Sequence, residues 1–211
     1  MRRHLGILLI AAGLVVMAWP VVTWAYGLYW QERLASDLPS IHAAAGPEAN
    51  APSSVVAAVQ RAVPKSARST AAVASGSAFV RLWIKRISLD ALVVEGDDSI
   101  SLRRGPGHLP NSGYPGENRN CVIAAHRDGW FRRLHELKTG DPVWLETRDN
   151  LFKYTVEEKQ EVLPNRTDLL DQGKNPILTL ITCTGPNYPH SKYRLLVFCR
   201  LRGIYPRNAA P

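Results

Sequence analysis

Three side chains with complementary chemistry each stand at the edge of a segment that is typical of a β-strand. The apolar, β-branched run 177–184 carries Cys183 near its end, and the run 121–125 is followed at once by His126. Arg194 lies at the start of a third such run. Strands of this kind deliver their terminal side chains to loops at the mouth of a fold. A thiol, an imidazole and a guanidinium in one compact domain are the groups that acyl transfer requires.

Each of these groups also has an ordinary structural explanation. Cysteine is among the most buried residue types, so a lone thiol more often serves packing than catalysis. By strand alternation Cys183 shares a face with Ile177 and Ile181, as a core residue would. We favour catalysis because all three groups stand at strand ends. The alternative is a non-catalytic β-barrel binding module with a structural cysteine.

Histidines and cysteines outside this group have weaker claims to catalysis. His190, in the loop after Cys183, is the one rival to His126, and the others are expected in solvent or loops: His4, His42, His108 and His135. Cys121 and Cys199 lie inside apolar runs, as core residues or as a disulfide pair in an oxidising compartment. No Cys-x-x-Cys pair and no metal cluster of carboxylates stands out, so we predict neither a metal site nor a required cofactor.

Length and charge limit the possible partners. The chain has 211 residues, of which 45% are hydrophobic, enough for one well-buried domain with some length left over. Its formal net charge is +8, yet the basic residues are scattered and no recognised nucleic-acid motif accompanies them. We therefore expect one domain plus an anchor, and no nucleic-acid partner.

The N-terminal run 5–30 carries no charged side chain. Its length of about 26 residues exceeds the roughly 20 that a helix needs to cross a bilayer. Because Arg2 and Arg3 precede it, the positive-inside rule places residues 1–4 in the cytoplasm and the domain outside. We predict an uncleaved, single-pass transmembrane anchor in the cell membrane. A cleaved signal peptide is the alternative, but no small-x-small site follows a short apolar core.

The rest of the chain divides into a spacer, a domain and a tail. Residues 31–77 are rich in Ala, Ser, Pro and Gly and predict an extracytoplasmic linker. Residues 78–205 hold many short strand-like runs, such as 79–87, and one segment, 104–116, too dense in Gly and Pro for regular structure. This pattern predicts a mainly β domain, a closed or nearly closed β-barrel with short helices. Residues 206–211 form the tail.

Several short motifs together closely resemble those of the sortases, membrane-anchored cysteine transpeptidases of bacteria. The resemblance rests on Leu-Thr-Leu-Ile-Thr-Cys at 178–183 with Arg194 about eleven residues on, Ala-Ala-His-Arg-Asp at 124–128, and Gly-Pro-Gly-His-Leu at 105–109. Phe-Arg-Arg-Leu at 131–134 and Leu-Lys-Thr-Gly-Asp at 137–141 are most similar to the class D branch. The resemblance extends over residues 79–202.

The resemblance implies a closed eight-stranded β-barrel with an active-site groove. It assigns Cys183 as the nucleophile, His126 as the general acid and base, and Arg194 as the donor that stabilises the oxyanion or the substrate carbonyl. Thr182 and Ile181, which precede the cysteine, are candidate substrate-binding residues.

The same resemblance implies the reaction and its partners. A secreted protein with a C-terminal LPxTG-like sorting signal would acylate the cysteine. An amine from a cell-envelope component or another protein would then accept the acyl group. If water were the usual acceptor, the enzyme would be a cysteine endopeptidase, an alternative that the three residues leave open. The loop 184–192 is expected to decide which peptide reaches the cysteine.

Overall fold

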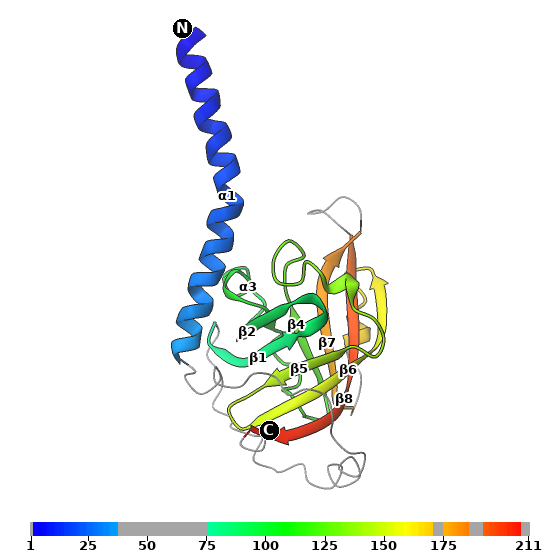
Figure 1. Cartoon of the computed structure of the whole chain (residues 1–211). Coiled ribbons are helices and arrows are strands. Elements are labelled where there is room, and N and C mark those ends of the chain that lie inside the picture. Colours follow the sequence, from blue (N-terminus) through cyan, green and yellow to red (C-terminus); the bar gives the residue numbers. More distant parts are fainter. Residues whose placement is uncertain (1, 38–75, 171–174, 186–191, 208–211) are drawn as a thin grey trace.

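The computed structural model describes residues 2–37, 76–170, 175–185 and 192–207. Within them, eight strands close into one barrel in the order β1-β2-β3-β4-β7-β8-β6-β5 (Figure 1). Their bounds are β1 Ala78–Ile84, β2 Leu89–Glu95, β3 Gly107–His108, β4 Asn120–Ala124, β5 Pro142–Glu146, β6 Asn150–Val162, β7 Ile177–Thr184 and β8 Tyr193–Pro206. The prediction of a mainly β, closed barrel is confirmed.

An apolar core fills the barrel, and its side chains alternate along the strands. In β1, Val80, Leu82 and Ile84 are fully buried, whereas Arg81 and Trp83 between them are half-buried. This is the pattern of a strand with one face inside a barrel. A slip of one residue would turn the whole apolar set outward, so the alternation fixes the pairing of the strands. The core thereby holds the strand ends at defined positions.

Parallel pairing of β4 with β7 determines where the strand ends meet. The pairing runs from Asn120 opposite Ile177 to Ala124 opposite Ile181, whereas β7 and β8 are antiparallel. Because parallel strands end on the same side, the carboxyl ends of β4 and β7 lie with the amino end of β8 at one end of the barrel.

The Gly- and Pro-dense segment is more ordered than its composition predicts. The short helix α3 (Ser101–Arg104) leads into it, and Gly107–His108 form β3, parallel to β2 and antiparallel to β4. Position 107 requires glycine because a Cβ there would collide with the carbonyl oxygen of Gly96. The expectation that His108 lies in solvent or in a loop is wrong, since its side chain is 1% exposed.

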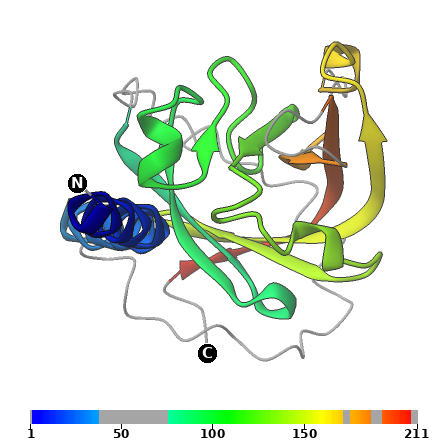
Figure 2. The ribbon, with the colours of Figure 1, turned by 90° about the horizontal axis from the view of Figure 1, so that it is seen from above.

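Beside the barrel lies one long helix, α1 (Arg2–Asp37), seen from the side in Figure 1 and end-on in Figure 2. Its carboxyl end packs on the barrel, and its amino-terminal half projects beyond it. Residues 31–37, predicted as linker, are therefore helical, because Gln31 and Leu34 contact β2. The predicted linker from 38 to 75 lies outside the described residues. Within the described part of the chain, no helix has both the length and the apolarity expected of a membrane span.

All three cysteines are free thiols in the structure. Cys121 on β4 and Cys199 on β8 are both level with Leu178 on the strand between them. Two interstrand steps separate them by roughly 10 Å, which exceeds the span of a disulfide. The disulfide alternative is therefore excluded, and both thiols are core residues.

Candidate active site

Cys183, Arg194 and His126 lie level with one another on three neighbouring stretches of chain. Cys183 on β7 is directly opposite Arg194 on β8. On the other side of β7, the parallel register pairs Ala124 with Ile181, and two residues further on it brings His126 level with Cys183. Neighbouring strands are about 4.8 Å apart. The structure thus brings the three predicted residues together in one row at one end of the barrel.

Hydrogen bonds between β7 and the segment that follows β4 continue this register beyond the end of β4. The backbone N–H of Ala125 donates to the carbonyl of Ile181 at 3.1 Å, and the hydroxyl of Thr182 donates to the carbonyl of Ala125 at 2.9 Å. On the far side of the histidine, Nη1 of Arg127 donates to the carbonyl of Gly185 at 2.8 Å. The histidine is therefore held between two attachments to the strand that carries the thiol.

The two candidate substrate-binding residues point to opposite faces of β7. Ile181 shares the outer face with Cys183, and both side chains are half-buried. Thr182 points the other way and is 4% exposed. Since its hydroxyl already donates to the carbonyl of Ala125, the Thr182 side chain supports the backbone next to the histidine. Ile181 is the better placed of the two to touch a substrate.

An apolar cluster covers the outer face of β7 and β8 beside the thiol. Its buried members are Ile177, Leu196 and Phe198, with Val162, Leu169, Leu170 and Ile181 packed against them. A cavity of about 330 Å³ lies at the end of this surface that is remote from the thiol. Half of the residues that line this cavity are polar or charged, namely Glu157, Glu158, Gln160 and Arg200. We call the apolar cluster the outer apolar surface.

One buried amide attaches the cover of the outer apolar surface to the barrel. The cover includes the short 3-10 helix Thr167–Leu170. Nδ2 of Asn120 donates to the carbonyl of Leu170 at 2.8 Å, and its Oδ1 accepts from the hydroxyl of Thr179 at 2.9 Å. Sequence reasoning missed Asn120, because an asparagine at the start of a strand is usually a turn residue.

The histidine begins a turn that is anchored in the core. The carbonyl of His126 accepts from the backbone N–H of Gly129 at 3.2 Å and of Phe131 at 3.3 Å. Phe131 is 1% exposed and belongs to the barrel core, whereas His126 is exposed. The imidazole thus lies at the surface, while the turn that carries it is anchored to the barrel core by Phe131. His190, the predicted rival, lies outside the described residues.

A second group of side chains imitates a catalytic triad but is structural. Ser112 Oγ lies 2.9 Å from Nε2 of His108, whose Nδ1 lies 3.0 Å from Glu95. The same Nε2 is 3.0 Å from the carbonyl oxygen of Gly113. A carbonyl can only accept, so Nε2 carries a proton and is not available to remove one from Ser112. The group instead ties the loop after β3 to β2.

Burial separates the three thiols by reactivity. Desolvation raises the pKa of the Cys121 and Cys199 thiols well above the ordinary value. Because the thiolate is the reactive form, iodoacetamide at about pH 8 is expected to modify only Cys183 in the folded protein and all three cysteines in denaturant. Intact-mass measurement and peptide mapping would show this. Modification of Cys121 or Cys199 at the rate of Cys183 would contradict it.

The sequence matches a known family over most of the barrel. The sequence profile of the sortase domain matches residues 82–202, more than half of the chain. The chain is 36% identical over 118 residues to sortase D of Bacillus subtilis (strain 168), which covers 56% of this chain and 58% of that protein. It is 30% identical over 160 residues to sortase SrtE1 of Streptomyces coelicolor, with 67% and 45% covered. The chain thus spans about half the length of these curated relatives.

Solved structures agree with the sequence matches. The crystal structure of sortase E1 from Streptomyces coelicolor with a tripeptide in its active site is similar with a TM-score of 0.60 and 29% identity, covering 66% of this chain and 97% of that one. A Clostridium perfringens sortase D5 transpeptidase is similar with a TM-score of 0.58 and 30% identity, covering 62% and 82%. The predicted resemblance to the sortases, including class D, is confirmed, and class E proteins match as well.

Proposed function

Since the chain belongs to the sortase family, whose members are cysteine transpeptidases, we propose that it cleaves a C-terminal LPxTG-like sorting signal and transfers the acyl group to an amine. The observation that carries the proposal is the row of side chains across the barrel end. In it, Cys183 is opposite Arg194 and level with His126. The substrate is a secreted protein, and the acceptor amine belongs to a cell-envelope component or another protein.

In the first half of the reaction, Sγ of Cys183 attacks the carbonyl carbon of the scissile peptide bond. The carbon–nitrogen bond breaks, His126 gives a proton to the departing amine, and the acyl group remains on sulfur as a thioester. The negative charge that develops on the carbonyl oxygen is stabilised by Arg194. A guanidinium suits this position because it stays charged and offers several directed donors.

In the second half, the acceptor amine attacks the thioester carbonyl. His126 removes a proton from the amine, a new amide bond forms, and the carbon–sulfur bond breaks to release the Cys183 thiolate. Each proton taken by the imidazole in one half is returned in the other. The reaction is therefore balanced without a metal or a redox cofactor.

The part of the outer apolar surface beside the thiol is the proposed binding surface for the signal peptide. It lies on the same face of β7 as Cys183, and Ile181 connects the two. An extended peptide laid along it would place an apolar side chain on the half-buried Ile181 while its scissile carbonyl reaches the thiol. Replacement of Ile181 by Asp should therefore raise KM more than it lowers kcat.

We also propose that the enzyme is a single-pass membrane protein with its barrel outside the cytoplasm. Support comes from the charge-free run 5–30, which as a helix is about 39 Å long and exceeds the roughly 30 Å hydrocarbon layer. Apolar side chains on the described part of α1 are also exposed, namely Leu14, Val16, Met17, Trp19, Val21, Val22, Tyr26, Leu28 and Tyr29. A bilayer would cover such a surface.

The contacts of α1 indicate how the barrel would then face the membrane. Leu34 meets β2 near the base of the helix, and Gly27, two turns closer to the amino end, meets Trp130 in the turn after His126. The amino end of α1 therefore points in the same direction as the end of the barrel that carries Cys183 (Figure 1). With the amino-terminal part of α1 in the bilayer, the active site faces the membrane surface.

The decisive experiment uses the full chain in detergent micelles and a panel of LPxTG-like peptides. Each peptide is incubated with and without a glycine peptide as the amine, and the products are identified by mass spectrometry. The expected product with amine is a new amide between the peptide fragment and the glycine peptide, with a transient acyl adduct on Cys183. Release of acid alone, even at high amine concentration, would instead identify a cysteine endopeptidase. No cleavage and no adduct with any peptide would overturn the proposal and favour a binding module.

A further inference from the structure

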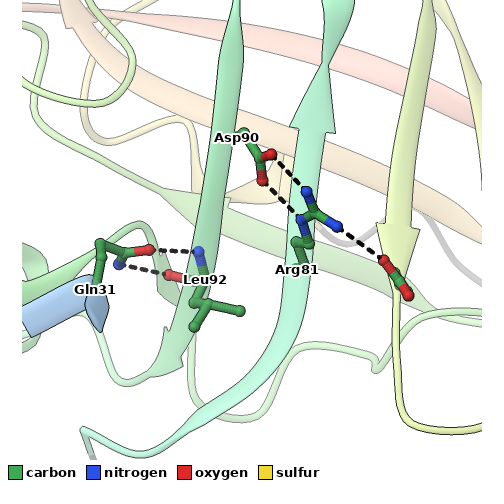
Figure 3. A network of polar contacts seen from close by, with 5 residues as sticks. Gln31, Arg81, Asp90 and Leu92 are labelled. Atoms are coloured by element: carbon green, nitrogen blue, oxygen red, sulfur yellow. Dashed lines mark hydrogen bonds and ion pairs between the residues drawn. The ribbon is translucent and has the colours of Figure 1, made fainter. Parts of the chain in front are cut away.

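The side-chain amide of Gln31 joins the carboxyl end of α1 to the barrel, because it bonds both backbone groups of one residue in β2, as a neighbouring strand would. Oε1 of Gln31 accepts from the backbone N–H of Leu92 at 2.7 Å, and Nε2 donates to the carbonyl of Leu92 at 3.1 Å (Figure 3). Nε2 also lies 2.9 Å from the carbonyl of Arg104 at the end of α3. Since β2 pairs with β3 only at Val94 and Glu95, this amide satisfies backbone groups that β3 does not reach. Gln31 therefore attaches α1 to the part of β2 that lies beyond β3.

Two further contacts hold α1 against the barrel. Leu34 is 4% exposed and packs with Leu92 of β2. One turn nearer the amino end, the guanidinium of Arg104 lies 4.2 Å from the ring centre of Trp30. Apolar burial and a cation–π contact thus add to the pairing by Gln31. The three contacts hold the helix over little more than one turn, from Trp30 to Leu34.

Another contact of α1 with the barrel reaches the turn that carries the proposed catalytic histidine. Gly27 is buried, and a Cβ at this position would lie 3.7 Å from Cζ2 of Trp130 and 3.9 Å from the carbonyl oxygen of Arg103. The indole therefore lies against the bare backbone of the helix. Its other side packs on the barrel core. Glycine is unfavourable inside a helix, so this close approach is a physical reason for its presence.

A shift of Trp130 would move the backbone of the turn that begins at His126. It lies between Gly129 and Phe131, whose backbone N–H groups both donate to the carbonyl of His126. Phe131 fixes the turn from inside the barrel, and Trp130 fixes it from outside against α1. The imidazole therefore depends on two supports, one of which is the helix.

We infer that α1 is a working part of the catalytic site, in which Gly27 and Trp130 act as positioning residues that hold the turn of His126. The inference rests on the proposed transpeptidase function and deepens it. The helix that is proposed to anchor the enzyme also completes its active site, so activity requires α1 to be docked.

The test replaces Gly27 with Leu in the full chain, because a larger side chain must displace the indole. A displacement of about 1 Å at a catalytic group can cost up to about 100-fold in rate, so we expect Gly27→Leu to lower kcat at least about tenfold while KM changes less than about twofold. Trp130→Ala should have the same effect. The Gly27→Leu/Trp130→Ala double variant should lose no more than the worse single variant, because both act through one contact.

One control variant separates positioning from general damage. Gly13→Leu makes the same substitution in the same helix at a glycine with no neighbour within 4 Å, and should retain wild-type kcat. If Gly27→Leu does not fold, Trp130→Phe carries the test, since it keeps the apolar packing but shortens the reach to α1, and it should lower kcat without raising KM.

The results distinguish this inference from the proposed function. Wild-type kcat for Gly27→Leu, additive losses in the double variant, or losses confined to KM would each overturn the inference while transpeptidation by the wild-type chain still stands. An inactive wild-type chain would overturn the proposed function itself. A lower thermal unfolding midpoint that accounts for the whole loss would also overturn positioning, because a docked helix that serves only stability predicts that result.

Discussion

Replacement of Cys183 by alanine is expected to lower kcat by a factor of about 10⁴ or more, because no other group can carry the acyl intermediate. Cys183 is the half-buried thiol of the three, and it lies at the barrel end opposite Arg194. The measurement is the rate of amide formation with a signal peptide, together with mass spectrometry for the acyl adduct. Both the product and the adduct should disappear.

Cys199→Ala is the matched control for this variant. Cys199 is also a free thiol, on the strand next to β7, but it is 1% exposed and lies inside the core. Its loss should leave kcat within about twofold of wild type while lowering the free energy of unfolding by about 1 kcal/mol, since a buried atom is removed. Activity that survives Cys183→Ala but not Cys199→Ala would show that the wrong thiol has been identified.

The strands that build the barrel could be predicted because each carries its own signal. The alternation in β1 and the apolar run in β7 are local patterns that follow from burial of one face or both. Strand β3 has no such pattern, since its two residues are strand only because β2 and β4 pair with them. The docked end of α1 likewise depends on Gln31 and Leu92, which are 61 residues apart in sequence.

In the candidate site, too, some residues carry a signal in the local sequence and others depend on contacts between distant parts of the chain. The placement of Cys183, His126 and Arg194 at one end of the barrel could be predicted, because strand ends converge there and these side chains are chemically distinctive. Asn120 and Trp130 could not be predicted, since an amide and an indole have many ordinary uses and their roles appear only through Leu170 and Gly27. Positions whose roles depend on tertiary contacts therefore require the structure.

Removal of the guanidinium should have the second largest effect. Arg194→Ala is expected to lower kcat by about 10²–10³-fold, the usual consequence of losing one oxyanion donor, with a smaller change in KM. The register places Arg194 directly opposite Cys183, and Nη1 of its guanidinium donates to the carbonyl of Tyr193 at 3.1 Å. Arg194→Lys keeps the charge but loses the planar fork of donors, and should recover only part of the rate.

Arg202→Ala provides the comparison that separates a local donor from the general positive charge. Arg202 lies on the same strand, is exposed, and pairs with Glu157 at 3.1 Å. It stands eight residues from Arg194, about 26 Å along an extended strand, so its charge is screened from the thiol in physiological salt. Its removal should leave kcat unchanged. Equal losses in Arg194→Ala and Arg202→Ala would mean that net charge, which attracts the substrate, matters more than a donor aimed at the oxyanion.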